Sequence, residues 1–358
     1  EQDAIFTYHF YRLMYRASKV NLFYNGTTDG IQVGEPSRFI RQWAFDCPET
    51  HSWQEHTQNV PFVPPPSSHK SIPKTPAVME KLLELAKAGF SPSGLNVFVK
   101  DGYAFYKRYL LGLREEDELE TYFSHKTYGT LTHNCLEALY MPYVGKQLSQ
   151  SDCKDMIDRV DTVADEMVKL EYPQNISGKN VLALAAIKRN IQNIIAHEQS
   201  EIEAGNVIEI VALEQKLSMT QVVPGIEGPV TFKGTVDRVD KYNGTIRVLD
   251  YKTGQLQDLG IMDWTGLVND PDRGQARQLL MYAMLWNTHN PNNPTGQAGV
   301  IAIKQYKKGV LYVGEKASAR GKVSPTLAAE QIQKAALVFE ELTQTLFDPN
   351  CPFSEPAA

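Results

Sequence analysis

The stretch GTVDRVDKYNGTIRVLDYKTG, Gly234–Gly254, decides how the chain is expected to fold. Asn243-Gly244 near its centre is the strongest short signal for a two-residue β-turn, so the stretch predicts two antiparallel strands. With these two residues at the centre of the turn, Tyr242 pairs with Thr245. The register then continues outward from that pair, because turn type and loop length fix the pairing of a hairpin.

This register brings charged side chains together across the two predicted strands. Asp240 lies opposite Arg247, an opposite-charge pair that supports the register. Asp237 lies opposite Asp250 with Cβ atoms roughly 5 Å apart, where like charges repel unless a cation compensates them. Lys252, two residues beyond Asp250, points to the same face roughly 7 Å along the strand. The pattern predicts a divalent-cation site; the alternative is a salt-bridged row on a surface strand.

Carboxylates in this arrangement suit Mg²⁺ or Mn²⁺, which prefer oxygen ligands and usually take one or two carboxylates together with water and substrate phosphate. Asp237 and Asp250 can supply them. A metal held there lowers the pKa of bound water and neutralises charge that develops on a phosphoryl oxygen. Lys252 can hold the resulting hydroxide or the phosphate as a compact point charge. Glu214 ends an apolar alternation that predicts a strand over residues 207–217, and it either joins this acidic cluster or is an exposed edge-strand glutamate.

Two helical segments carry further polar residues. His133 lies on a mostly apolar face of a predicted helix over residues 129–140, which is typical of a core histidine, although histidine also ligates manganese. Gln278 and Tyr282 are four residues apart on an otherwise apolar helix. Because buried polar groups need partners, this pair bonds either a DNA phosphate or base or a neighbouring backbone.

Length and composition describe an ordinary globular protein. The chain has 358 residues, 42% of them hydrophobic, enough for one large domain with or without a smaller one. No run approaches the ~18 apolar residues of a membrane span. The four cysteines have no CxxC spacing, so we expect neither structural zinc nor disulfides and take the cytoplasm as the default location. A net charge of −6 leaves nucleic-acid contact to a partner or to a local basic patch, for which the lysine-rich residues 304–322 are a candidate and solvated loops the alternative.

The order of segments predicts the architecture. Residues 48–76 are rich in His, Ser and Pro and are typical of an extended linker. We therefore expect one unit over residues 1–75 and a second over residues 76–358. In the second unit helices come first, then strands, then more helices. This order predicts an α/β (α+β) fold with a small mixed β-sheet flanked by helices.

The pattern GTVDRVD…VLDYKTG resembles the PD-(D/E)xK nuclease superfamily, specifically its RecB-like nuclease domains. Other motifs agree in order and spacing. GTLTHNCLE, which contains His133, resembles the family's first helix, and ALEQKL places Glu214 where the family has an acidic residue before the hairpin. Gln278-Leu-Leu-Met-Tyr282 resembles the motif Q-x-x-x-Y. SPSGLNVFVKDGYAFYKRYLLGL is similar to the segment that opens AddB-type nuclease domains, so the resemblance covers roughly residues 90–350.

The resemblance implies a metal-dependent DNA exonuclease domain that uses Mg²⁺ or Mn²⁺ to hydrolyse phosphodiester bonds. It implies a restriction-endonuclease-like core with helical additions, DNA as substrate, and a helicase domain or subunit as partner in double-strand-break repair and recombination. The residues that it assigns are the metal ligands His133, Asp237, Asp250 and the Tyr251 carbonyl, the catalytic Asp237, Asp250, Lys252 and Glu214, and Gln278 and Tyr282 for placing the DNA strand.

Two features depart from the AddB-type pattern. Several AddB-type relatives have a cysteine that ligates an iron–sulfur cluster where this chain has Asp101, and near the end only Cys351 remains, so no iron–sulfur cluster is expected.

Residues 1–46 resemble the tail of a helicase-like domain, and we expect a fragment of a larger repair protein. The alternatives are a catalytically silent DNA- or helicase-binding scaffold of the same fold, or a single-strand-preferring endonuclease.

Overall fold

The structure, a computed structural model, describes residues 2–24, 28–29, 32–33, 35–48, 50–57, 70–113, 123–172 and 177–356. It divides into two compact units, Glu1–Ser67 and Ser68–Ala358. The proline-rich part of the predicted linker, residues 58–69, lies outside the described residues.

The smaller unit contains two helices and a short antiparallel hairpin. Aromatic rings join the helices: Phe10 stacks on Phe39 with ring centroids 5.2 Å apart, and Tyr11 contacts Trp43 at 5.7 Å. Helix α2 buries none of its residues. Its helicase-like character stays a prediction. The elements are α1 (Gln2–Met14), β1 (Thr28–Asp29), β2 (Gln32–Val33) and α2 (Arg38–Phe45).

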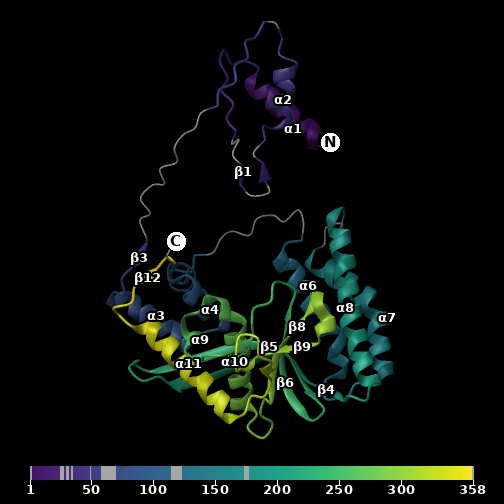
Figure 1. Cartoon of the computed structure of the whole chain (residues 1–358), viewed down its shortest axis with the longest axis vertical. Helices are drawn as coiled ribbons and strands as arrows, with labels where there is room; N and C mark the ends of the chain where they lie inside the picture. Colours follow the sequence, from purple (N-terminus) through teal and green to yellow (C-terminus); the bar gives the residue numbers. More distant parts are fainter. Residues whose placement is uncertain are drawn as a thin grey trace. The chain divides into compact units, whose positions relative to one another are not determined.

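A five-stranded mixed sheet organises the larger unit, with strand order β4-β5-β6-β8-β9 (Figure 1). Strands β6 and β8 run parallel, and the other neighbouring pairs are antiparallel. The predicted fold class, a small mixed sheet flanked by helices, is confirmed. The strands are β4 (Ile208–Val222), β5 (Pro229–Tyr242), β6 (Thr245–Lys252), β8 (Gln297–Ala302) and β9 (Val310–Tyr312).

The β5–β6 hairpin has the predicted register. Both residues of its Asn-Gly turn have positive φ, 49° and 87°, as a type I′ turn requires. Pairing begins at Tyr242–Thr245 and continues to Arg238–Leu249. The next two residues outward, Asp237 and Asp250, are therefore level with each other at the point where the two strands stop pairing.

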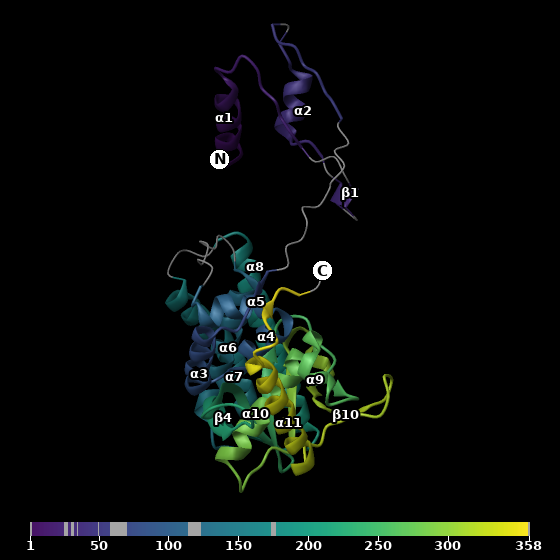
Figure 2. The same cartoon turned by 90° about the vertical axis from the view of Figure 1, so that its left-hand side faces the viewer.

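Helices cover both faces of the sheet (Figures 1 and 2), and each face has its own apolar core. Successive residues of β6 point to opposite faces, as strand geometry requires: Val248 joins one core and Leu249 the other. The first core takes α3 (Pro76–Ala88), α4 (Pro92–Lys100), α10 (Gly274–His289) and α11 (Ala329–Phe347); the second takes α6 (His125–Tyr140), α7 (Gln150–Glu171) and α8 (Lys179–Glu203).

The aromatic segment after α4 does not continue as one helix, contrary to the pattern of its sequence. Asp101 leaves the helical conformation with φ −156° and ψ 97°, and its side chain accepts a hydrogen bond of 2.8 Å from the Ala104 amide. Aspartate is stabilising as an N-cap and weakly unfavourable inside a helix, so it ends α4 and starts a new turn. The new turn is α5 (Gly102–Phe105), followed by a π-helical turn, η1 (Tyr106–Leu110).

The C-terminal strand packs on this broken segment. Phe353, fully buried, has ring centroids 5.8 to 6.2 Å from those of Phe98, Phe105 and Tyr106. A Cβ at Gly102 would lie 3.3 Å from backbone atoms of Ser354, so the two segments are in close contact. Strand β12 (Phe353–Ser354) pairs with β3 (Ser71–Ile72), which holds both ends of the larger unit together.

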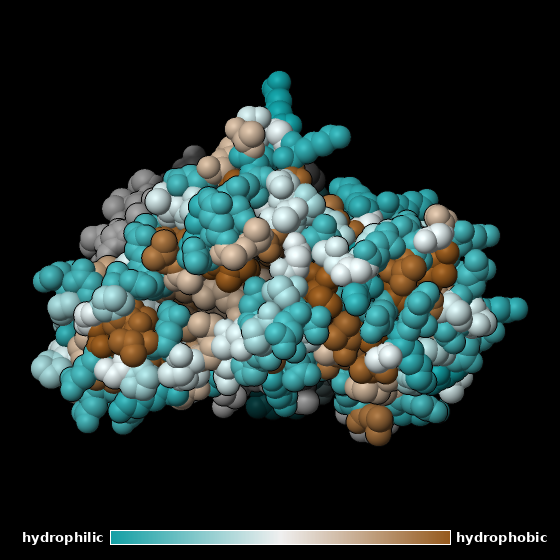
Figure 3. All heavy atoms as spheres, turned by 90° about the horizontal axis from the view of Figure 1, so that it is seen from below, coloured by the Kyte–Doolittle hydropathy of each residue, from teal (hydrophilic) through white to brown (hydrophobic). Residues whose placement is uncertain are grey.

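The remaining elements are short. Strands β7, β10 and β11 form a separate three-stranded sheet. None of the helices in the described ranges is both long and apolar enough to cross a lipid bilayer. The face seen from below is largely hydrophilic, with apolar side chains gathered in separate patches (Figure 3). These elements are η2 (Met141–Tyr143), β7 (Gly260–Ile261), α9 (Gly266–Asn269), η3 (Pro271–Arg273), η4 (Ile303–Lys308), β10 (Gly314–Lys316) and β11 (Val323–Ser324).

Candidate metal centre

Three acidic residues lie in one row across three neighbouring strands. The pairs on either side of Glu214 bring it level with Asp237, and the end of the hairpin brings Asp237 level with Asp250. Glu214 has a φ of 43°, a left-handed conformation that few residues other than glycine adopt. Such a conformation costs about 1–3 kcal/mol and occurs mostly at functional sites.

Helix α6 adds a histidine to this row. His133 Nδ1 lies 3.4 Å from Asp237 Oδ2, and its Nε2 lies 3.0 Å from the carbonyl oxygen of Tyr251. One ligand atom from each of His133, Glu214 and Asp237 falls within 4.8 Å of the others. A surface hollow opens over this group. It is lined by Gly129, Thr130, His133, Asn134 and Glu214.

Both backbone polar groups of Tyr251, its amide and its carbonyl, contact residues of this group. Its amide donates a 2.8 Å hydrogen bond to Asp237 Oδ2, and its carbonyl faces His133. The 3.0 Å between that carbonyl oxygen and His133 Nε2 is a hydrogen-bond distance. With the ring proton on Nε2 and donated to this carbonyl, the lone pair of His133 Nδ1 faces Asp237 Oδ2 at 3.4 Å, and these two atoms would be the ones to hold a divalent ion.

Asp250 lies beside this group and is held by two other residues. Its Oδ2 forms an ion pair of 2.8 Å with Lys252 Nζ, without the angles of a hydrogen bond. Its Oδ1 accepts a 2.9 Å hydrogen bond from Gln278 Nε2, and the same amide donates to the Tyr282 hydroxyl at 2.9 Å. Lys252 keeps 27% of its side chain exposed, whereas Asp250 keeps 2%. The Lys252 side chain therefore reaches solvent, whereas the Asp250 carboxylate is buried and held by Gln278.

Tyr282 is packed too closely to move toward solvent. It is 6% exposed, and a Cβ at Gly234 would lie 2.6 Å from its Cε1. Only glycine fits at that strand position. Gln278 and Tyr282, the pair predicted to place the DNA strand, therefore have hydrogen-bond partners inside the protein. Gln278 donates both to Asp250 and to Tyr282.

Burial and the charges of neighbouring acids raise the pKa values of Asp237 and Glu214. Burial, followed by the charge of Asp250, raises the pKa of Asp237 well above its ordinary value. Burial, Glu137 and Asp250 raise the pKa of Glu214 to about 6. Burial lowers the pKa of His133, so its ring is neutral at neutral pH and can offer a lone pair to a metal. A cation would relieve the crowded negative charge, so the donor set fits a divalent metal.

A buried ionic network, absent from the sequence-based expectations, lies behind Tyr251. Arg238, fully buried, contacts Glu198 Oε1 at 2.7 Å and Asp240 Oδ2 at 2.8 Å. The Tyr140 ring lies 4.8 Å from its guanidinium, and the Tyr140 hydroxyl donates to Glu198 at 2.7 Å. Arg238 Nη1 also donates to the Tyr251 hydroxyl at 3.4 Å. The sequence signal for this network is Arg238 itself, a charged residue on the core-facing side of a predicted strand, where it needs a buried ionic partner.

The structure brings together His133, Glu214 and Asp237, with the Tyr251 peptide against them and the Asp250–Lys252 pair alongside. A row of acids at the end of a hairpin, a lysine two residues after the last of them, and helices on both faces define a nuclease fold of the PD-(D/E)XK type. The sequence profile of the PD-(D/E)XK nuclease superfamily matches residues 89–357, and the chain belongs to this superfamily.

The names of several curated relatives combine a helicase with a nuclease. Two Streptococcus pneumoniae proteins, one named as part of an ATP-dependent helicase/deoxyribonuclease and the other as the exonuclease/helicase protein RexB, are each 27% identical over 211 residues, 55% of this chain. A Streptococcus agalactiae ATP-dependent helicase/deoxyribonuclease protein is 22% identical over 164 residues, 46% of this chain. The chain spans 17% and 14% of the length of these relatives. A crystal structure of a provisionally assigned exonuclease from Eubacterium rectale has a TM-score of 0.38 and 16% identity, covering 76% of this chain and 86% of that one.

Proposed function

We propose that this chain is a Mg²⁺- or Mn²⁺-dependent deoxyribonuclease, the exonuclease domain of a helicase–nuclease that acts in double-strand-break repair and recombination. One observation carries the proposal. His133, Glu214 and Asp237 converge within 4.8 Å beside the ion pair of buried Asp250 with Lys252, in a chain of the PD-(D/E)XK superfamily. Members of that superfamily use divalent metals.

The residues divide into those that would hold the metal and those that act beside it. His133, Glu214, Asp237 and the Tyr251 carbonyl would hold the ion, with Asp250 next to them. When bound, a divalent metal activates water and neutralises charge on the phosphoryl oxygens. Lys252, partly exposed and aligned by Asp250, can orient the attacking water or bind the scissile phosphate through its ammonium group.

Gln278 and Tyr282 act from inside the protein. Because Gln278 donates to both the Asp250 carboxylate and the Tyr282 hydroxyl, it fixes the orientation of that carboxylate. Groups that orient a catalytic carboxylate typically change affinity or activity 10–100-fold when removed. We therefore propose a positioning role for this pair, in addition to the DNA contact that the family resemblance implies.

The names of the relatives support a helicase partner. Those names join a helicase and a nuclease in one assembly. We propose that this chain, likewise, acts on DNA with a helicase domain or subunit, and that residues 1–75 belong to the connection with it. A cytoplasmic location stays part of this proposal.

Two isosteric variants test the proposal. Asp250→Asn and Lys252→Met should each abolish Mg²⁺- or Mn²⁺-dependent digestion of linear duplex DNA while the circular dichroism spectrum stays that of the parent. Asp158→Asn, an exposed change on α7, is the matched charge control and should retain full activity. Undiminished digestion by either site variant refutes the assignment.

Two further measurements separate the rival functions. Calorimetric titration with Mn²⁺ should show binding that Asp237→Asn removes; no heat above background would favour a silent scaffold. Linear DNA should be digested and covalently closed circular DNA should not. Cleavage of single-stranded circles would instead identify an endonuclease.

A further inference from the structure

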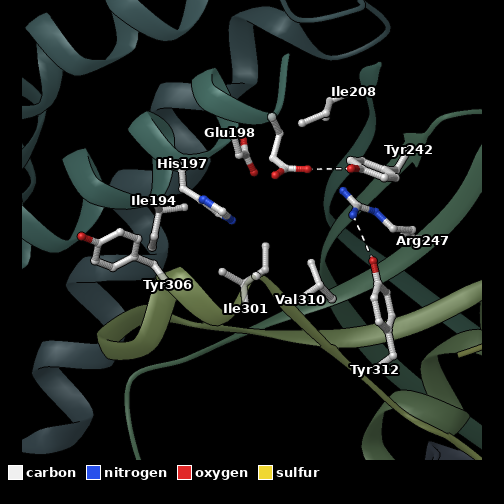
Figure 4. Close-up of a pocket in the computed structure, with 12 residues that line it drawn as sticks. Ile194, His197, Glu198, Ile208, Tyr242, Arg247, Ile301, Tyr306, Val310 and Tyr312 are labelled. Carbon is white, nitrogen blue, oxygen red and sulfur yellow. Dashed lines mark hydrogen bonds between the residues drawn. The ribbon is translucent and has the colours of Figure 1, made fainter. Parts of the chain in front are cut away.

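A second hollow lies between helix α8 and the sheet (Figure 4). It has a volume of about 680 Å³ including the part open to solvent. None of the acids in the catalytic row lines it. The lining residues are Ile194, His197, Glu198, Glu201, Ile208, Tyr242, Arg247, Ile301, Tyr306, Gly309, Val310 and Tyr312.

Apolar and aromatic side chains line the hollow on several sides. Ile194, Ile208 and Ile301 are each buried to more than nine tenths. Tyr306 lies on one side with the His197 ring, whose centroid is 6.5 Å away, and Tyr242 lies on the opposite side (Figure 4). Aromatic rings among apolar side chains suit a flat aromatic ligand, which stacks or packs edge-on against them.

Acidic groups on the wall determine what the ligand can be. Both hydrogen bonds that the described residues give to Glu201, from Tyr242 and Asn206, end on Oε2, so Oε1 can accept another. Glu198 lines the same wall. Carboxylates repel phosphate but accept hydrogen bonds from the exocyclic amino groups of nucleobases. Glu198 is paired with Arg238, and Arg247, the cation that lines the hollow, is paired with Asp240. The free acceptor on the wall is therefore Glu201 Oε1, which fits the amino group of a base.

The chain segment next to the hollow, which we call its rim, carries three lysines. The short helix η4 contributes Tyr306 to the hollow and carries Lys304, Lys307 and Lys308, all exposed. Within the described ranges, no acidic group lies at ion-pair distance from any of the three. Lysines of this kind hold a nucleic-acid backbone through its phosphates, and aromatic side chains beside them hold the bases.

The rim also connects with the metal centre. Strand β8 places Ala302 beside Lys252, and η4 begins at the next residue. The Lys304 ammonium lies 5.7 Å from the centre of the Tyr128 ring, on the same helix as His133 and five residues before it. Helix η4 thus connects the strand end beside Lys252 with the hollow.

We propose that this hollow binds one unpaired nucleobase of a DNA single strand, with the neighbouring phosphates on Lys307 and Lys308. The site extends the proposed function, because the strand it holds is the strand whose phosphate reaches the metal centre. The base is flanked by Tyr306 and bonded by Glu201, while the chain continues over Lys304 toward Lys252.

The assignment of Lys307 and Lys308 to the phosphates is tested by measuring DNA binding in the absence of metal, where no cleavage occurs. A fluorescent 12-nucleotide oligo-dC is titrated in EDTA across a range of salt concentrations. Reversing both rim charges in Lys307→Glu/Lys308→Glu should weaken binding and lower the slope of log K against log salt by about 1.4, since each phosphate contact on a single strand contributes about 0.7. Lys81→Glu/Lys87→Glu, on α3, makes the same change of net charge and should leave the slope unchanged. Equal effects of the two double variants overturn the rim assignment.

The base pocket is tested by placing one abasic residue at successive positions of that oligonucleotide. For the parent protein, one position should weaken binding about tenfold, in line with the loss of one stacked base. Tyr306→Leu should abolish that position dependence, and Tyr306→Phe, which keeps the ring, should retain it. A parent profile with no sensitive position, or an unchanged profile in Tyr306→Leu with Tyr306→Phe as folding control, overturns the proposal. Because the assay contains no metal, either result leaves the nuclease assignment to its own test.

Discussion

Replacing Glu214 with glutamine is expected to raise the free energy of unfolding of the metal-free protein. In the presence of metal, the variant is expected to be less stable than the parent. The folded-state pKa of Glu214 is raised from 4.5 to about 6 by burial and by the charges of Glu137 and Asp250. A raised pKa means that the favourable contribution of this carboxyl is complete below pH 4.5 and is lost as the pH rises through 6. At pH 7 the ionised Glu214 is therefore a cost that glutamine removes.

The size of the effect follows from that shift. A rise from 4.5 to about 6 corresponds to about 2 kcal/mol for a fully buried group. Since Glu214 is only half-buried, we expect about 1 kcal/mol after screening by solvent, or a melting temperature about 2 °C higher. With metal at 100 times its dissociation constant, the parent gains about 2.7 kcal/mol. The variant, which lacks one ligand, should gain much less, so the order of stabilities reverses.

Urea unfolding at pH 7, in EDTA and then in Mn²⁺, measures both effects. Glu84→Gln, an exposed change on α3, is the charge-matched control and should change neither. Repeating the EDTA series from pH 7 down to pH 4.5 should close the gap between parent and Glu214→Gln. A metal-free variant less stable than the parent, or an equal gain of both proteins from Mn²⁺, would show that Glu214 is not part of a repulsive, metal-binding row.

Three further substitutions have expected outcomes. Gln278→Leu should lower kcat for DNA digestion 10–100-fold, since Asp250 loses the donor that orients it, and should cost about 1–3 kcal/mol of stability because a buried acceptor is left unsatisfied; a loss of stability with unchanged kcat would argue against positioning. Phe353→Ala should lower the free energy of unfolding by about 3–5 kcal/mol in urea titrations, and a loss under 1 kcal/mol would show that the C-terminal strand does not anchor the unit. Gly234→Ala should cost about 1–3 kcal/mol, because its Cβ meets Tyr282 at 2.6 Å; an unchanged urea midpoint would contradict this.

The hairpin could be predicted because its determinants are local. The Asn-Gly turn fixes the register within a few residues, and the register then fixes which side chains share a face. Asp237 and Asp250 were expected to lie level with each other, and pairing up to Arg238–Leu249 brings them there. The fold class was accessible for a similar reason, since helical and strand periodicities follow one another clearly along the chain.

The composition of the metal centre depends on contacts between distant segments, which periodicity does not encode. His133 has the pattern of a core histidine, and only the packing of α6 against β6 brings it to the Tyr251 carbonyl. Glu214 reaches the row because β4 pairs with β5 and its backbone turns left-handed there. Asp101 breaks the helix for a different reason: its capping side chain competes with an apolar periodicity that by itself would favour a continuous helix.

The distribution of unfavourable features in the larger unit argues for a site under functional constraint. The left-handed Glu214, the raised pKa values of Glu214 and Asp237, and the buried Arg238 all lie next to the Tyr251 peptide or to the acidic row. Buried ion pairs such as Arg238–Glu198 contribute little net stability, because desolvation cancels most of their attraction. The two apolar cores must therefore stabilise the sheet against these local costs. A cation in the row would remove the electrostatic part of the cost, so metal binding and folding should be thermodynamically linked in this protein.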